Sequence, residues 1–253
     1  MVLMLTLYNT PHSTCSQKVR ICLAEKGLDW HDINIDLAKN EHLTPEYLKI
    51  NENGVIPTLV HDEIIVKDSS VICEYIDEVF HVHSLTPEDP VKRAAMRSWM
   101  RFIEEVPTPA VRVPSFNMAF LTRFKGLSKN QFYDQQSDIR PLRKEFYRRM
   151  GPDGFNKEDF ISAIEKIYTT TKRMERSLEE GPWLIGGSYS IADIILAPLL
   201  DRMDDLGFAK IWNSDFPNVV NWFKRIQVRP AFQRAFHKGT RLSELHNLKR
   251  GNY

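Results

Sequence analysis

Three hydroxyl groups and one thiol are adjacent in the sequence Ser13-Thr14-Cys15-Ser16. Turn-forming residues precede them and a helical pattern follows, so they lie in the first turn of a predicted helix. The N-terminus of a helix favours negative charge, and a hydroxyl there can donate a hydrogen bond to an anion. A thiol in the same place is favoured as its thiolate. The spacing therefore indicates thiolate chemistry, although a lone serine before a helix is more often only an N-cap.

Composition and charge exclude several classes of protein. The chain has 253 residues, 42% hydrophobic and 26% charged, which is typical of a folded protein with one large domain or two small ones. Its 34 Lys and Arg nearly balance 33 Asp and Glu, so the net charge of +1 gives no field that attracts nucleic acid or an anionic membrane. The apolar runs at residues 1–7 and 191–200 do not have the pattern of a signal peptide or a membrane span. We expect no nucleic-acid partner and no membrane partner.

The cysteines indicate a reducing compartment. Cys15, Cys22 and Cys73 are odd in number and sparse for a chain of this size, which argues against a secreted disulfide framework. No His, Cys or Glu spacing matches a metal site, and no glycine-rich phosphate loop is present. We expect a cytoplasmic protein without a metal.

The elements that position the Ser13-Thr14-Cys15-Ser16 segment belong to a pattern that is complete by about residue 80. A buried strand at residues 2–8 is followed by a helix from about 13–16 to 26–27 and an alternating strand at 30–36, which form a βαβ unit. Strands at 55–60 and 63–66 form a hairpin, and Asp68-Ser69-Ser70 offers N-cap chemistry to a helix at 71–76. The first 80 residues therefore predict an α/β unit of the form βαβ followed by ββα.

The rest of the chain is predicted to be helical. Apolar residues recur every three or four positions from Phe160 to Leu178, Ser190-Ile191-Ala192-Asp193 resembles a capping box, and Pro198 should kink the helix that follows. Pro217 suits the first turn of another helix. The boundary lies near residues 81–89, so we expect an α/β domain at 1–81 and an all-α domain at 90–253.

In this arrangement the chain resembles the cytosolic glutathione transferases, which have a thioredoxin-like N-terminal domain and an all-helical C-terminal domain. Four separated motifs carry the resemblance, in order and at the family's spacing over nearly the whole chain. They are Ser13-Thr14-Cys15-Ser16, Val55-Ile56-Pro57, Asp68-Ser69 and Ser190-Ile191-Ala192-Asp193.

Different segments resemble different branches of that superfamily. The run Tyr8-Asn9-Thr10-Pro11-His12-Ser13-Thr14-Cys15-Ser16 is similar to zeta-class maleylacetoacetate isomerases and to tetrachlorohydroquinone reductive dehalogenases. Val71-Ile72-Cys73-Glu74-Tyr75, the run at residues 89–94 and Gly154-Phe155 look like bacterial lignin β-etherases, which cleave β-aryl ethers with glutathione. The resemblance implies an enzyme that attacks a hydrophobic aromatic electrophile with glutathione, by ether cleavage or by the isomerase or dehalogenase reaction. A non-catalytic glutathione or hydrophobic-ligand binder on the same fold is the remaining alternative.

Activating the glutathione thiol is the chemistry that the first helix would have to supply. A free thiol with a pKa of roughly 8.5 is only about 3% ionised at pH 7, and lowering that pKa by about two units requires about 2.7 kcal/mol. A hydrogen bond to a charged acceptor contributes about 1.5 to 3 kcal/mol, and a helix N-terminus up to about 2. Ser13 matches the zeta-type catalytic serine, Ser16 is the hydroxyl shared with the β-etherase pattern, and Cys15 is a buried apolar residue, a helper donor or a redox nucleophile.

The resemblance also implies residues that hold the glutathione tripeptide. Pro57 would be the family's cis-proline, which lets the Ile56 backbone pair with the cysteinyl unit as an added strand. Asp68 and Ser69 stand where the family holds the γ-glutamyl end, with helix capping as the other interpretation. His42 resembles the histidine that meets the glycyl carboxylate, but it also fits an exposed loop, and Val55 replaces a frequent glutamine.

The electrophile site and the dimer contact fall in the second domain. Candidate lining residues are Pro107, Val111, Arg112, Phe116, Met118, Phe120 and Phe124, each of which also fits a core position. The basic cluster at residues 140–149 is interpreted as a solvated face. We expect a homodimer, with Trp99 and Phe102 as exposed contributors to its interface.

Overall fold

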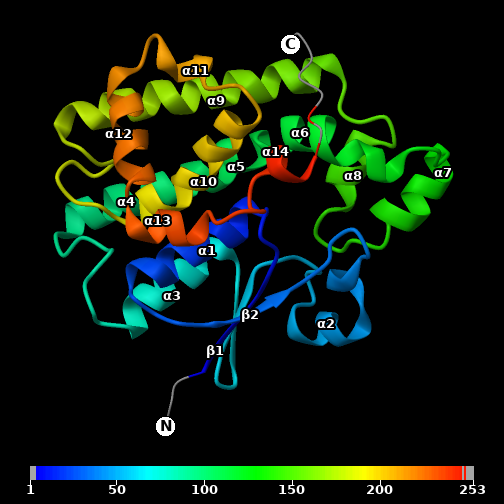
Figure 1. Cartoon of the computed structure of the whole chain (residues 1–253), viewed down its shortest axis with the longest axis horizontal. Helices are drawn as coiled ribbons and strands as arrows, with labels where there is room; N and C mark the ends of the chain where they lie inside the picture. The colour runs from blue at the N-terminus through cyan, green and yellow to red at the C-terminus, as the bar shows by residue number, and fades with distance from the viewer. Residues whose placement is uncertain (1–3, 247, 249–253) are drawn as a thin grey trace.

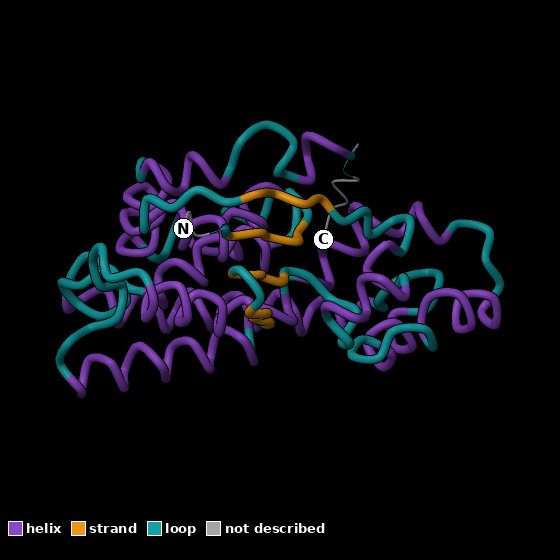
Figure 2. Tube along the Cα trace, turned by 90° about the horizontal axis from the view of Figure 1, so that it is seen from below, coloured by secondary structure: helices purple, strands orange, loops and turns teal. Residues whose placement is uncertain are grey.

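The first part of the chain forms one four-stranded mixed sheet. A computed structural model describes residues 4–246 and 248. The strands are β1 (Leu5–Asn9), β2 (His31–Asn34), β3 (Thr58–His61) and β4 (Ile64–Lys67), in the order β2-β1-β3-β4. β1 pairs parallel with β2 and antiparallel with β3, and β3 pairs antiparallel with β4. Figure 2 shows the strands of this sheet beside one another. The predicted βαβ unit and hairpin are therefore confirmed.

The observed start of β3 differs from the predicted start by three residues. The predicted start of β1 at residues 2 and 3 lies outside the described residues. β3 begins at Thr58 instead of Val55, and Pro57 just before it has no N–H to donate to a ladder. Residues 55–57 therefore form a connection that leads into the strand without joining the sheet.

Helix α1 (Thr14–Glu25) occupies the centre of the molecule, between the sheet and the C-terminal helices (Figure 1). Residues 16–23 are all buried, and the helix ends at Lys26 before Gly27, whose φ of 65° suits glycine. Ion pairs fix α1 to later elements: Lys18 Nζ lies 2.6 Å from Glu104 Oε1, and Arg229 Nε lies 2.6 Å from Glu25 Oε1. The N-terminal end of α1 is therefore held in place by contacts along the whole helix.

The two other helices of the first part are α2 (Pro45–Ile50) and α3 (Ser69–Val79). After a connection at residues 80–89, the chain is helical. The longer helices are α4 (Pro90–Glu105), α9 (Lys157–Ser177), α10 (Ile191–Asp205) and α12 (Pro217–Gln227). The short ones are α5 (Pro107–Ala110), α6 (Arg112–Ser115), α7 (Lys129–Phe132), α8 (Lys144–Met150), α11 (Lys210–Asn213), α13 (Pro230–Ala235) and α14 (Leu242–Leu245).

The core of the helical part is organised around the N-terminus of α10. Ser190 and Asp193 form the predicted capping box. The Asp193 carboxylate also accepts hydrogen bonds from the backbone N–H of Leu184, at 3.0 Å, and from Trp222 Nε1, at 2.8 Å. Burial raises the pKa of Asp193 to about 6, and these hydrogen bonds oppose the rise. Asp193 is thus a structural residue, and α10 continues through Pro198 to Asp205.

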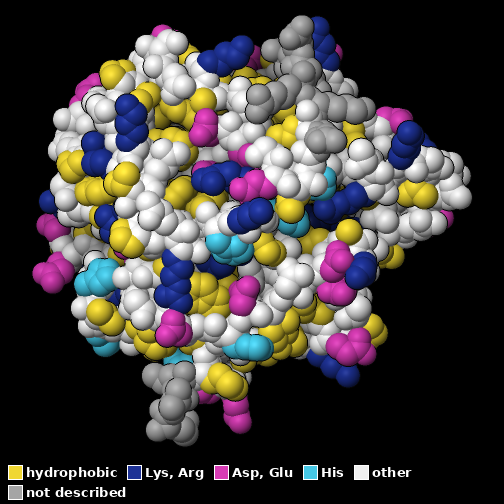
Figure 3. Space-filling model, viewed as in Figure 1, with side chains coloured by type: hydrophobic (Ala, Val, Ile, Leu, Met, Phe, Trp, Pro, Cys, Tyr) yellow, Lys and Arg dark blue, Asp and Glu magenta, His cyan; other side chains and the backbone are white. Residues whose placement is uncertain are grey.

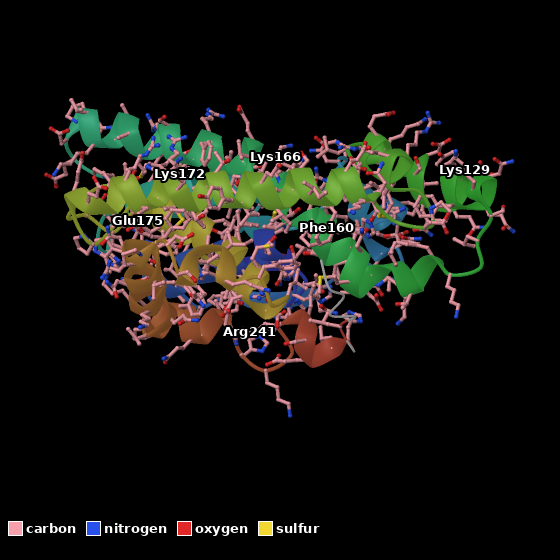
Figure 4. The ribbon with its side chains drawn as sticks, turned by 90° about the horizontal axis from the view of Figure 1, so that it is seen from above. Lys129, Phe160, Lys166, Lys172, Glu175 and Arg241 are labelled. Carbon is pink, nitrogen blue, oxygen red and sulfur yellow. The ribbon has the colours of Figure 1, made fainter. Side chains whose placement is uncertain are left out.

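Helix α9 buries the predicted apolar face. Phe160, Ile167 and Met174 are all buried on it. Glu175, which Figure 4 shows on α9 beside α12, accepts hydrogen bonds from the backbone N–H groups of Asn218 and Val219 and so caps α12. The predicted helix that starts at Pro217 is therefore confirmed and is tied to α9.

Trp99 and Phe102, both predicted to be exposed, are covered in the structure. Trp99 is only 4% exposed and belongs to the main core, and Phe102 is partly buried against that core. The guanidinium of Arg173 lies 4.3 Å from the Trp99 ring and 4.2 Å from the Phe102 ring, so α9 covers both side chains. In residues 4–246 and 248, no helix combines the length and the apolar character that crossing a membrane requires.

Candidate functional site

A cavity of about 220 Å³ lies between the N-terminal end of α1 and the short helices of the second part. Its N-terminal wall comes from the first part of the chain and consists of His12, Ser13, Thr14, Cys15, Leu37, Ala38, His42, Gly54, Val55 and Ile56. Its C-terminal wall consists of Val111, Arg112, Ser115, Phe116, Phe120, Arg123, Phe124, Gln136, Arg140, Arg143, Phe146, Tyr147 and Arg202. The cavity thus joins the predicted thiolate site to the predicted electrophile region.

Ser13 lies at the N-terminus of α1 and faces the cavity. Its Oγ accepts a hydrogen bond from the backbone N–H of Ser16 at 3.3 Å, so Ser13 is the N-cap of α1. A hydroxyl that accepts through a lone pair still has its own hydrogen to donate. Capping and donation to a thiolate are therefore compatible.

Ser16 and Cys15 differ in their access to the cavity. Ser16 is fully buried, does not line the cavity, and its Oγ has no hydrogen-bond partner among the described residues. Cys15 is partly exposed and lines the cavity. Burial lowers the pKa of Arg143 and of Arg202 to about 10, and the nearby Cys15 side chain acts in the opposite direction on both. Cys15 therefore lies close to two arginines of the C-terminal wall.

The Val55-Ile56-Pro57 segment presents backbone groups to the cavity. The Ile56–Pro57 peptide bond is cis, as predicted. The Val55 carbonyl accepts from Tyr47 Oη at 2.8 Å and from Asn51 Nδ2 at 3.0 Å. Within residues 4–246 and 248, the Ile56 N–H and C=O make no hydrogen bond. Ile56 thus has a free donor and a free acceptor in the lining.

His42 is a buried histidine of the N-terminal wall, not an exposed loop residue. His42 is only 6% exposed to solvent. Burial lowers the pKa of its imidazole to about 4, and the nearby positive charge of Arg140 adds to the shift. Its Nδ1 has no partner among the residues that the structure describes. A neutral imidazole at this position can still donate one hydrogen bond to a carboxylate.

Asp68 and Ser69 do not line the cavity. Asp68 is the N-cap of α3, and its Oδ1 accepts from the backbone N–H groups of Ser70 and Val71 at 3.0 and 3.3 Å. Ser69 is buried in the first turn of α3. The structure therefore shows that Asp68 caps a helix, which is one of the two roles predicted for Asp68 and Ser69. Their other predicted role, binding of the γ-glutamyl end of glutathione, stays a prediction.

Aromatic rings dominate the C-terminal wall. The Phe116 ring contacts the rings of Phe120, Phe146 and Tyr147, with centroids 5.2, 5.1 and 5.8 Å away. Of the residues predicted for the electrophile site, Val111, Arg112, Phe116, Phe120 and Phe124 line the cavity. Pro107 and Met118 are buried outside its lining.

The solvated-face interpretation of residues 140–149 is wrong for part of the cluster. Arg148 and Arg149 are exposed and bind Asp138 and Asp159. Arg140 and Arg143, in contrast, line the cavity, and Arg140 is only 5% exposed. Arg140 and Arg143 lie in the turns before α8, so no helical periodicity in the sequence separates them from Arg148 and Arg149.

The cavity is also lined by His12, Arg123, Gln136 and Arg202, which no pattern in the sequence indicates. Burial lowers the pKa of His12 to about 3, and three arginines and His246 add to the shift. In the part of the chain that the structure describes, five arginines line the cavity and none of the lining residues is Asp or Glu. Figure 3 shows Lys, Arg and His side chains gathered across the middle of one face of the molecule.

The fold and the cavity match one family of enzymes. The family models "Glutathione S-transferase, N-terminal domain" and "Glutathione S-transferase, C-terminal domain" match residues 12–79 and 140–225. The chain belongs to the glutathione S-transferase family. It is an enzyme that uses glutathione as a substrate, with the family's thioredoxin-like domain and all-helical domain.

Among its relatives is the protein LigF of Sphingobium sp. strain SYK-6, which is 30% identical over 94% of this chain and 95% of its own length. The crystal structure of this β-etherase superposes with a TM-score of 0.82 over 92% of this chain and 98% of LigF. The tetrachloro-p-hydroquinone reductive dehalogenase of Sphingobium chlorophenolicum is 27% identical over 91% of this chain and 94% of its own. The maleylacetoacetate isomerase of Rattus norvegicus is 29% identical over 90% of this chain and 89% of its own length. All three branches that the sequence resembles are thus among its relatives.

Proposed function

We propose that this glutathione transferase cleaves a β-aryl ether by attack of the glutathione thiolate. The observation that carries the proposal is that Ser13 and the aromatic C-terminal wall share one cavity, in a chain similar to a β-etherase over nearly its whole length. A hydroxyl at a helix N-terminus suits a thiolate, and a wall of aromatic rings suits an aromatic electrophile.

Glutathione would lie along the N-terminal wall. The free N–H and C=O of Ile56 would pair with the cysteinyl unit, next to Val55 and the cis Pro57. The buried His42, with its unpartnered Nδ1, would donate to the glycyl carboxylate. Asp68 and Ser69, at the start of α3, would bind the γ-glutamyl end.

Ser13 would stabilise the thiolate. Its Oγ hydrogen is free to donate while its lone pair caps α1, and the N-terminus of α1 adds a favourable potential. A hydrogen bond to a charged group contributes about 1.5 to 3 kcal/mol, enough to lower a thiol pKa by one to two units. The thiol proton passes to solvent before the reaction.

In the reaction, the thiolate attacks the carbon that carries the aryl ether oxygen. A carbon–sulfur bond forms, the carbon–oxygen bond breaks, and the aryl oxygen leaves with the electron pair as a phenolate that takes a proton from solvent. No oxidant or reductant is required. The products are a glutathione thioether and a free phenol.

Reductive dehalogenation is a second candidate, because Cys15 lies in the cavity. In that reaction the thiol of Cys15 attacks the sulfur of a glutathionyl aromatic adduct, which releases the reduced arene and leaves a mixed disulfide on Cys15. A second glutathione would then release oxidised glutathione. Isomerisation of maleylacetoacetate is a third candidate, which rests on the zeta-like first helix and on the similarity to the maleylacetoacetate isomerase of Rattus norvegicus.

One experiment compares these reactions. The protein is incubated with glutathione and, in parallel, a β-aryl ether, maleylacetone or a chlorohydroquinone, and the products and Cys15 are analysed by mass spectrometry. We expect a phenol and a glutathione thioether from the ether. If the chlorohydroquinone is turned over with glutathionylated Cys15 while the ether stays intact, the dehalogenase assignment replaces the proposal.

The protein is further proposed to act as a cytoplasmic homodimer. All three cysteines are free, and Cys22 and Cys73 are buried, which suits a reducing compartment. Sedimentation at micromolar concentration tests the dimer, and a mass near 29.5 kDa, that of one chain, would refute it.

A further inference from the structure

Two arginines of the C-terminal wall have no partner for their charge. Arg112, in α6, and Arg143, just before α8, both line the cavity and are partly buried. Within residues 4–246 and 248, neither guanidinium makes a hydrogen bond or an ion pair. The Glu104 carboxylate, which raises the pKa of Arg143, is already bound by Lys18, whose Nζ lies 2.6 Å from Glu104 Oε1.

The other arginines of the cavity are engaged by the protein. Arg140 donates to Asn40 Oδ1 at 2.7 Å and lies 4.4 Å from the Tyr147 ring centroid. Arg202 donates to Ser115 Oγ at 3.3 Å and to the His12 carbonyl. Arg123 lies 4.5 Å from the Phe120 ring centroid. Arg112 and Arg143 are thus set apart from the structural arginines around them.

The two free charges also repel each other. Burial lowers the pKa of Arg143 to about 10, and Arg112 adds to the shift. Among the described residues no Asp or Glu lines the cavity, so a bound anion would supply the partner that the two guanidinium groups lack. A planar guanidinium favours a carboxylate or a similar oxyanion, which it can bind through two parallel hydrogen bonds.

We propose that Arg112 and Arg143 bind the negative charge of an aromatic electrophile, so that the second substrate is an aryl compound with a carboxylate group. This inference rests on the proposed function, which puts the carboxylates of glutathione at His42 and Ser69 on the N-terminal side. Arg112 and Arg143 come from the other wall, beside Cys15 and the aromatic rings. They therefore select the acceptor substrate.

Two glutathione conjugates test the inference without turnover. S-benzylglutathione and S-(p-carboxybenzyl)glutathione both fill the glutathione site and the aromatic region, and they differ only in the carboxylate. Isothermal titration calorimetry measures their dissociation constants for the wild type, for Arg143→Gln and Arg112→Gln, and for Arg149→Gln as a control. Arg149 is exposed and binds Asp159, outside the cavity.

We expect the carboxylated conjugate to bind wild type and Arg149→Gln about 10- to 100-fold more tightly than the neutral one, the range of a charge-assisted hydrogen bond. Arg143→Gln and Arg112→Gln should lose most of that preference and keep their affinity for S-benzylglutathione. Equal binding of both conjugates to the wild type overturns the inference and leaves the proposed function intact. A loss of affinity for both conjugates in the variants also overturns it, because the arginines would then hold glutathione itself. If neither conjugate binds the wild type, the glutathione site itself is refuted and the inference falls with it.

Discussion

The two walls of the cavity are built in different ways. The N-terminal wall is built mainly from the first turn of α1, the residues before β3 and the 3-10 helical turn Glu41–Leu43 that carries His42. It presents backbone groups, hydroxyls and a thiol. Most of the C-terminal wall comes from short helices, helical turns and the segment before α8, whereas Arg202 comes from the long helix α10. Together these elements present aromatic rings and five arginines.

This difference separates what each wall can recognise. Helix ends and unpaired strand backbone have fixed directions, so the N-terminal wall suits one peptide-like ligand that is common to a family. Side chains on short helices change with little effect on the fold, so the C-terminal wall suits variable substrates. We therefore expect substitutions in the first wall to change thiolate chemistry and substitutions in the second to change acceptor binding.

Ser13→Ala is expected to have the largest effect on catalysis. Removing one donor that stabilises an anion typically reduces turnover about 10- to 1,000-fold. The pKa of bound glutathione, followed by thiolate absorbance, should rise toward that of free glutathione, while the affinity for glutathione changes little. A bound thiol pKa equal to the free value already in the wild type would contradict the role of Ser13.

Ser16→Ala is the matched control. Ser16 lies on the same helix, but its hydroxyl is buried without a described partner and outside the lining. Removing an unsatisfied buried hydroxyl is neutral or stabilising. Turnover in Ser16→Ala should therefore equal that of the wild type, and a loss as large as that of Ser13→Ala would reassign the activator.

The same comparison explains what the sequence could predict. The N-terminal wall depends on local signals: an N-cap before an amphipathic helix, a proline before a strand, and a second N-cap at Asp68. These signals predicted the elements around Ser13, Ile56 and Asp68 to within a few residues. The position of Asp68 outside the cavity lining depends on how α3 packs, which no local signal gives.

The C-terminal wall depends on packing between distant segments. Arg140, Arg143 and Arg202 come together only when α10 and the segment before α8 fold against α1. A run of basic residues is usually a solvated face, so the sequence predicts exposure for Arg140 and Arg143, which the structure contradicts. The predicted exposure of Trp99 is wrong for a similar reason, because Arg173, 74 positions later, covers its ring.

The next largest expected effect is a change with pH in the free energy of unfolding, caused by the buried His42. Its pKa in the folded protein is about 4, below the ordinary value of 6.5, so the unfolded chain takes up a proton more readily. Above about pH 6.5 His42 is neutral in both the folded and the unfolded chain, and the folded protein has its full stability with respect to this residue. As the pH falls toward 4, protonation of His42 in the unfolded chain lowers the free energy of unfolding. The free energy of unfolding is expected to be about 2 kcal/mol lower at pH 5 than at pH 7, because each pH unit below 6.5 lowers it by about 1.4 kcal/mol.

Urea unfolding at pH 7 and pH 5 measures this effect. His12, with a pKa of about 3, and other groups contribute their own slopes, so the informative quantity is the difference between wild type and His42→Gln. The variant should lose less stability between the two pH values than the wild type does. Equal losses in both proteins would mean that His42 is not held neutral by burial.

Phe116→Ala tests whether the C-terminal wall binds the aromatic acceptor, and its expected effect on KM is smaller than the effects described above. Phe116 contacts three other aromatic rings of the wall. An aromatic pair contributes about 0.5 to 1.5 kcal/mol beyond its buried area, so the KM of an aromatic acceptor should rise about 3- to 10-fold. The KM of glutathione should stay constant, with Phe116→Leu as the control for lost volume. A parallel rise in both KM values would contradict the division between the walls.

Cys15→Ser should have the smallest effect, and it separates the two candidate reactions. A serine keeps the position in the first turn of α1 and nearly the same volume, and Ser13 remains as the activator. Turnover of a β-aryl ether should stay within about threefold of the wild type, which corresponds to about 0.7 kcal/mol in the barrier. Reductive dehalogenation makes the opposite demand, because only a thiol can resolve the glutathionyl adduct by thiol–disulfide exchange. Steady-state rates with an ether and with a chlorohydroquinone, measured on wild type and variant, therefore decide whether the thiol of the N-terminal wall is part of the chemistry. Loss of all activity toward both substrates in Cys15→Ser would make Cys15, and not Ser13, the residue on which catalysis depends.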